Sequence, residues 1–160
     1  ELKYSFESMS DEAKSNASRI ISINSIVVDD LTFLLSIVDD ESQDFDVRIQ
    51  AIKVVGYSEV LKNTSECIES FINIAINKND DLYVRVESLI CLSFSNFGLK
   101  FIDKFYEIII DEDDELDVRY AAFDALARQK TYSLGMEKLN YLLENKEFGK
   151  HVRIELHSPK

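Results

Sequence analysis

The residues of this sequence that could do chemistry are 30 acidic side chains, two cysteines and two histidines. Both histidines, His151 and His157, lie near the C-terminal end, with no cysteine or carboxylate set beside them at metal-ligand spacing. No Ser/His/Asp order, glycine-rich phosphate loop or glycosidase-like carboxylate pair stands out from the rest of the sequence. General acid–base catalysis therefore has few candidates, and we expect a protein that is not an enzyme and that uses no cofactor or metal.

Thirteen of the 30 acids fall in three short stretches: Asp39, Asp40, Glu41, Asp44 and Asp46; Asp80 and Asp81; and the six acids between 111 and 117. A calcium loop of the EF-hand type needs glycine at its sixth position and glutamate at its twelfth. Counted from Asp111, those positions hold Leu116 and Ala122, and the same count from Asp40 also fails. One interpretation is acidic helix starts, where each carboxylate complements the helix dipole by ~0.3–1 kcal/mol. That accounts for part of the acidic excess, and the binding of a basic protein stays open as the second interpretation for the remainder.

A formal net charge of −12 limits the classes of partner. Nucleic acids and anionic lipid surfaces are bound through Lys and Arg, so the charge argues against both and favours a basic protein partner. No run of 18 apolar residues is present, and Cys67 and Cys91 stand apart in apolar stretches. We expect free thiols in a reducing, cytoplasmic setting. The chain begins without Met and without a signal pattern, and we expect its first residue to result from trimming.

The elements that must position these residues are shown by a repeat. A Val-Arg pair ends at Arg48, recurs 37 residues later at Arg85, 34 later at Arg119 and 34 later at Arg153. A period near 35 residues is typical of stacked helix pairs. The sequence predicts one domain, 1–160, made of four helix pairs and a C-terminal remnant that either begins a fifth unit or forms an extended tail: about 10–39, 44–78, 81–111, 114–146 and 148–160.

Equivalent positions in these units carry similar residues. In the first helix of a pair, a small residue recurs as Ala51, Ser88 and Ala122. The second helices share four columns, in which fifteen of sixteen positions are apolar or aromatic: Leu31, Ile68, Ile102 and Met136; Leu34, Phe71, Phe105 and Leu139; Leu35, Ile72, Tyr106 and Asn140; Val38, Ala75, Ile109 and Leu143. These columns predict one buried face on each helix.

The first complete unit resembles the HEAT repeat, and in particular the short HEAT-like repeats first associated with phycobilisome lyases. The residues that carry the resemblance are an acidic turn followed by Asp46-Val47-Arg48, Ala51-Ile52 and Val55-Gly56. The resemblance covers residues 44–146 well, and 10–39 only through its second helix. It implies an all-α fold, a right-handed α-α superhelix (solenoid) of about four helix hairpins whose second helices line the concave side. Such repeats mostly supply binding surfaces.

The same resemblance implies that the repeat arginines pair with acids in their own or adjacent turns. The residues concerned are Asp46, Arg48, Arg85, Asp117 and Arg119, with Asp81 as a further candidate acid. Two departures stand out. Tyr83 occupies the position held by Asp46 and Asp117, which suggests an interruption, and Ala127-Arg128 replaces Val55-Gly56, which suggests a longer helix.

On the second helices, the positions flanking the buried face carry four carboxylates and an aromatic at one end: Glu69, Asn73, Asp103, Glu107, Glu137 and Tyr141. One interpretation is an ordinary solvated helix face. The other is an acidic groove that receives a basic protein, since complementary charge speeds association and an aromatic can anchor the complex.

These features favour a protein-binding module. Its most concrete form is an immunity protein (antitoxin) that neutralises a basic toxin such as a secreted nuclease, by analogy with small acidic repeat proteins of this size. One alternative is a lyase-like or chaperone-like subunit, which would need an exposed Cys67 or Cys91. Another is a scaffold segment of a longer repeat array, which the register resumed at Val152-Arg153 would suit.

Overall fold

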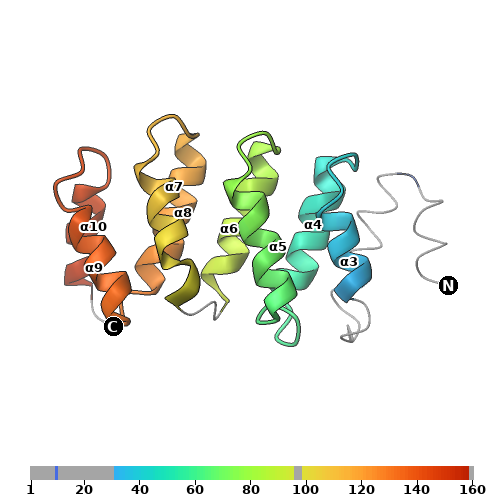
Figure 1. Ribbon diagram of the computed structural model, residues 1–160, viewed down its shortest axis with the longest axis horizontal. Helices are drawn as coiled ribbons and strands as arrows, with labels where there is room; N and C mark the ends of the chain where they lie inside the picture. Colours follow the sequence, from blue (N-terminus) through green and yellow to red (C-terminus); the bar gives the residue numbers. More distant parts are fainter. Residues whose placement is uncertain (1–9, 11–30, 96–98, 159–160) are drawn as a thin grey trace. The chain divides into compact units, whose positions relative to one another are not determined.

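The computed structural model describes residue 10, residues 31–95 and residues 99–158, and the helices within them are labelled in Figure 1. This part of the chain forms eight α-helices and one short 3-10 helix, and no strand occurs in it. The elements are α3 (Leu31–Val38), α4 (Phe45–Gly56), α5 (Ser65–Ile76), α6 (Leu82–Ser93), η2 (Leu99–Phe101), α7 (Ile102–Ile110), α8 (Leu116–Arg128), α9 (Ser133–Tyr141) and α10 (Gly149–His157). The predicted all-α class is confirmed, whereas the first helix predicted for 10–39 lies mostly outside the described residues.

The chain divides into two compact units, Glu1–Asn96 and Phe97–Lys160, and each is described by itself. In the first unit α4 packs on α3 and α6, and α5 packs on α6 and α3. In the second unit α7 packs on α8 and α9, and α8 also contacts α9. The prediction of a single domain stays a prediction.

The core of the first unit is made by the columns that the repeat predicts. Along α4, the side chains of Val47, Ala51, Ile52 and Val55 are fully buried. Val47, Ala51 and Val55 are spaced four residues apart, and Ile52 lies three before Val55, so one stripe of the helix faces inward and is removed from water. On α5 the predicted column positions are likewise buried: Ile68, Phe71, Ile72 and Ala75.

The second unit repeats this pattern on α7 but not on α9. Of the four column positions predicted for the last pair only Leu139 is buried, and α9 ends at Tyr141, before the fourth position, so the predicted buried face is wrong there. The last helix, α10, completes the core instead. Phe105 of α7 and Leu126 of α8 are fully buried, as are Phe148 and Val152 at the start of α10. The segment Gly149–His157 is helical, so of the two alternatives for the C-terminal remnant the extended tail is wrong.

Two local features follow from the repeat positions that differ. The helix containing Ala127-Arg128 spans 13 residues, against 12 for α4 and α6, a difference of one residue. At the matching position of α4, Gly56 meets Cys91 of α6, and a Cβ added at Gly56 would lie 2.5 Å from the Cys91 Cβ and nearer still to its Sγ. Glycine is therefore required by the close approach of α4 and α6.

Candidate functional site

The repeat arginines bind the end of the preceding helix. Each donates its Nε–H to the carbonyl oxygen ten residues earlier in the chain: Arg48 to Val38 at 2.9 Å, Arg85 to Ala75 at 3.1 Å and Arg119 to Ile109 at 2.9 Å. The last carbonyls of a helix lack intrahelical donors and carry the negative end of its dipole. A buried guanidinium satisfies both requirements, so these arginines connect one helix pair to the next.

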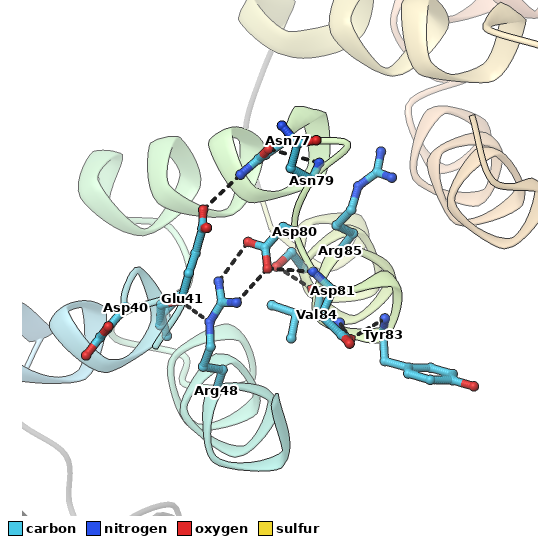
Figure 2. Close-up of polar contacts among 12 residues, drawn as sticks. Asp40, Glu41, Arg48, Asn77, Asn79, Asp80, Asp81, Tyr83, Val84 and Arg85 are labelled. Atoms are coloured by element: carbon cyan, nitrogen blue, oxygen red, sulfur yellow. Dashed lines mark hydrogen bonds and ion pairs between the residues drawn. The ribbon is translucent and has the colours of Figure 1, made fainter. Parts of the chain in front are cut away.

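Figure 2 shows the second partner of Arg48, the carboxylate of Asp80. Arg48 Nη1 lies 2.5 Å from Asp80 Oδ1 and Nη2 lies 2.8 Å from Oδ2, and both side chains are only 3% exposed. Burial alone would raise the pKa of Asp80, but hydrogen bonds from Arg48 and from the Asp81 N–H, together with the Arg48 charge, hold that pKa below its usual value. The pair therefore stays ionised in the folded protein near neutral pH.

The acid that pairs with Arg48 differs from both candidates in the sequence. Asp81 caps α6 instead, where its carboxylate accepts from the N–H groups of Tyr83 and Val84. Asp46 is exposed in the first turn of α4, and its backbone N–H donates to the capping Asp44. The residue that sequence reasoning missed, Asp80, lies in the link that follows the helix pair of Arg48.

In the second unit, Arg119 has a modified version of this arrangement. Its Nη1 lies 3.0 Å from Glu147 Oε2, and its guanidinium carbon lies 5.4 Å from the centre of the Phe148 ring. Phe148 stands five residues before Arg153, as Asp80 stands five before Arg85. The acid has thus moved one place along the chain, and Asp117, the candidate in the sequence, is exposed.

The links between pairs share one turn. An Asp or Asn stands eight residues before each Val-Arg arginine, and its side-chain oxygen accepts the N–H two residues on: Asp40 from Ser42, Asn77 from Asn79, Asp111 from Asp113 and Asn145 from Glu147. These side chains form Asx-turns. Part of the acidic excess in the links therefore forms these turns. The sequence contains the pattern that predicts them, an Asp or Asn eight residues before each arginine.

Two of the predicted groove residues, Glu69 and Asn73, lie exposed on α5 in the first unit. Asn73 borders a cleft of about 230 Å³ that the Arg48–Asp80 pair also lines. Its charged residues already have partners: Arg48 binds Asp80, and the other two carboxylates accept hydrogen bonds from neutral side chains of the same cleft.

The other four groove residues lie exposed in the second unit, with Asp103 and Glu107 on α7 and Glu137 and Tyr141 on α9. Two lysines that the sequence interpretation did not include neutralise part of this charge. Lys138 lies 2.7 Å from Asp103, and Lys104 lies 2.8 Å from Glu107. Lys138 also sits over the rings of Tyr106 and Tyr141, at 5.1 and 5.8 Å from their centres.

The link at 111–117 differs from this neutralised face. Asp111 forms the turn, and Asp114 accepts the Glu115 N–H at 2.8 Å. The other acids of the link are exposed, and within residues 99–158 no hydrogen bond or ion pair involves their side chains: Glu112, Asp113, Glu115 and Asp117. Glu112 also borders a cleft of about 680 Å³ whose lining includes Arg119 and Glu147. The link at 111–117 is therefore the candidate site for a cationic partner.

The thiols offer no nucleophile at the surface. Cys67 and Cys91 are both fully buried and unpaired. Burial raises the pKa of Cys67 to about 12, and burial followed by the nearby Glu87 charge raises the pKa of Cys91 further. Both stay protonated near neutral pH, and a thiol is a far weaker nucleophile than a thiolate.

Across residues 31–95 and 99–158, no group of three or more His, Cys, Asp and Glu side chains is arranged to hold a metal ion. None of the helices described above is both long and apolar enough to cross a membrane.

Comparisons of the chain with protein-family models, with curated proteins and with solved structures found no match. The case for a function therefore depends on the site itself.

Proposed function

We propose that this chain is a non-enzymatic, protein-binding module of HEAT-like repeats, folded as a right-handed superhelix of about four helix hairpins, that binds a basic protein. The most concrete form of this proposal is an immunity protein that neutralises a basic toxin such as a secreted nuclease. The net charge of −12 and the helix-pair repeat support it.

The observation that carries the proposal is a difference between two sets of carboxylates. Some accept hydrogen bonds or form ion pairs within the fold, and others are exposed without such a partner. Around the first link, Asp80 binds Arg48, Asp39 accepts from Ser70, and Glu41 accepts from Asn77. In the link at 111–117, four carboxylates project without such bonds among the described residues. Exposed like charges close together repel one another, so a cationic protein surface that neutralises them gains both binding energy and association rate.

The proposal is tested with basic toxin domains encoded beside this gene, titrated calorimetrically at about 0.01 M salt, where the Debye length is about 30 Å, and at about 0.1 M, where it is about 10 Å. Glu112→Lys with Glu115→Lys should weaken binding and flatten its salt dependence. Glu59→Lys with Glu66→Lys changes the net charge equally at exposed sites outside the link, and serves as the matched control. Absence of any complex at the lower salt concentration would overturn the proposal.

A third double variant, Asp103→Lys with Glu107→Lys, separates the link from the groove predicted on the second helices. These carboxylates already bind Lys138 and Lys104, so we expect a smaller loss than in the link variant. A larger loss would place the contact on α7 and α9 instead.

The alternative of a lyase-like subunit needs an accessible nucleophile, and the buried thiols of Cys67 and Cys91 count against a route through cysteine. The repeat also suits a scaffold role. A scaffold would bind a different partner from a toxin, but it could use the same surface.

A further inference from the structure

An exposed aromatic pair lies where α4 and α6 begin. The rings of Phe45 and Tyr83 are 6.3 Å apart between centres and tilted by 35°. Phe45 is 43% exposed and Tyr83 is 61% exposed, so neither ring is part of the core. The Arg48–Asp80 pair is a buried structural ion pair, and in Figure 2 the side chain of Tyr83 points away from it.

The repeat does not require an aromatic residue at this place. Tyr83 stands two residues before its arginine, where the neighbouring units have Asp46 and Asp117. Helices α4 and α8 begin normally with aspartate there, so α6 would also tolerate a short acidic side chain. The tyrosine therefore has no evident structural role, and an exposed aromatic pair is the kind of residue that anchors protein interfaces.

Carboxylates surround the pair in the chain. Asp44 and Asp46 flank Phe45, and Asp81 caps the helix that carries Tyr83. All three are exposed. The carboxylates of Asp44 and Asp81 accept backbone N–H groups but keep further lone pairs for an external donor. The side chain of Asp46 takes part in no hydrogen bond or ion pair within residues 31–95.

We propose that Phe45 and Tyr83, with Asp44, Asp46 and Asp81, form a docking surface for an arginine-bearing segment of a basic protein. A guanidinium stacks on an aromatic face and donates through its edge to carboxylates, so exposed rings with carboxylates beside them in the chain fit arginine better than lysine. The inference depends on the proposed function and adds a contact to it, in the first unit and separate from the link at 111–117.

The first test uses a poly-arginine peptide and a poly-lysine peptide of equal length, titrated into the whole chain. Tyr83→Asp removes a ring and adds a negative charge. If only charge mattered, this variant would bind poly-arginine more tightly. We expect about fivefold weaker binding, which corresponds to the loss of ~1 kcal/mol of cation–π energy.

Tyr57→Asp is the matched control. Tyr57 and Phe94 form a second exposed aromatic pair, at the other ends of the same two helices, with ring centres 6.0 Å apart. The substitution there makes the same change in charge and removes a ring that is 51% exposed, against 61% for Tyr83. We expect poly-arginine to bind the Tyr57→Asp variant as tightly as the unsubstituted chain, or more tightly. Far-UV circular dichroism confirms that both variants stay helical.

The outcomes separate this inference from the proposed function. Equal affinities of the Tyr83→Asp and Tyr57→Asp variants, or tighter binding of poly-lysine than of poly-arginine, would overturn the docking surface and leave a purely electrostatic basic-partner site. If the Glu112→Lys with Glu115→Lys variant lost affinity for poly-arginine and the Tyr83→Asp variant did not, the docking surface would likewise be overturned. Failure of both peptides to bind the unsubstituted chain at low salt would overturn both proposals.

Discussion

Arg48 and Asp80 lie 32 residues apart in the chain and meet as two almost fully buried ions joined by two hydrogen bonds. Arg48 also donates to the carbonyl of Val38, the last residue of α3. One guanidinium therefore connects three segments: the helix that comes before it, its own helix, and the link that comes after its helix pair. Because the guanidinium and its partner are buried, removing one of them leaves an unpaired buried charge, and this is the change that lowers the free energy of unfolding most.

Asp80→Asn should reduce the free energy of unfolding by ~3–5 kcal/mol, since it leaves the Arg48 charge buried without its counter-ion. Urea denaturation followed by circular dichroism measures the change. Asp113→Asn, at an exposed acid whose side chain has no bond among the described residues, should change the free energy by less than ~0.5 kcal/mol. A loss of under ~1 kcal/mol for Asp80→Asn would show that the pair is not buried as described.

The same pair predicts a dependence of stability on pH. Its contacts hold the pKa of Asp80 below the usual value in the folded state, so the unfolded chain takes up the proton more readily. The contribution of Asp80 is therefore fully present above the unfolded pKa of about 3.9 and is lost as pH falls through the lower, folded pKa. Denaturation measured from pH 6 down to about pH 3 should show a steeper loss for the unsubstituted chain than for Asp80→Asn. Equal slopes would contradict this account.

Replacing Arg48 by lysine tests whether the geometry or the charge matters. A lysine can approach Asp80, but it cannot also supply the fixed fork of donors that reaches Val38. We expect Arg48→Lys to lower the free energy of unfolding by ~1.5–3 kcal/mol. The matched control is Arg153→Lys, because Arg153 donates from Nη2 to the carbonyl of Leu143, also ten residues earlier, at 3.4 Å on the surface. A cost as large for Arg153→Lys would mean that the buried pair is not the cause.

The helices and the core could be predicted from the sequence because both depend on residue type at a fixed period. Val47 and Arg48 recur in every unit after 10–39, and the apolar columns are buried on α3, α5 and α7 at most positions, whereas on α9 they are mostly not buried. The acid that pairs with Arg48 could not be chosen from the motif alone. Asp46 precedes Arg48 by two residues, which on a helix places the two side chains on different sides. That argument could have excluded Asp46, but it could not have identified Asp80.

The predicted groove shows a different limit. The pairing of Lys104 with Glu107 follows from a spacing of three residues along one helix, and the sequence contains that information. The pairing of Lys138 with Asp103 depends on how α9 lies against α7, and residue types do not determine this register. A set of aligned carboxylates therefore predicted more negative charge on α7 and α9 than the folded second unit shows.

Gly56 provides a test of the packing between α4 and α6. Gly56→Ala should reduce the free energy of unfolding by ~1–3 kcal/mol, because the added methyl group would overlap the Cys91 side chain. Combining it with Cys91→Gly removes the obstacle. The two substitutions together should therefore cost less than the sum of the single costs, by ~0.5–3 kcal/mol. Strict additivity would show that α4 and α6 can separate to accept the methyl group.

Thiol reactivity distinguishes the binding proposal from the lyase-like alternative. Cys67 and Cys91 are buried, and burial raises the pKa of Cys67 to about 12, so at pH 8 neither should react with an aromatic disulfide reagent while the chain is folded. In denaturant both should react fully. Asn79→Cys places a thiol at an exposed position and supplies the positive control in the folded state. Rapid labelling of either native cysteine in the unsubstituted chain, at the rate of the Asn79→Cys control, would restore the covalent alternative, because a thiol that a small reagent reaches is also open to a client molecule.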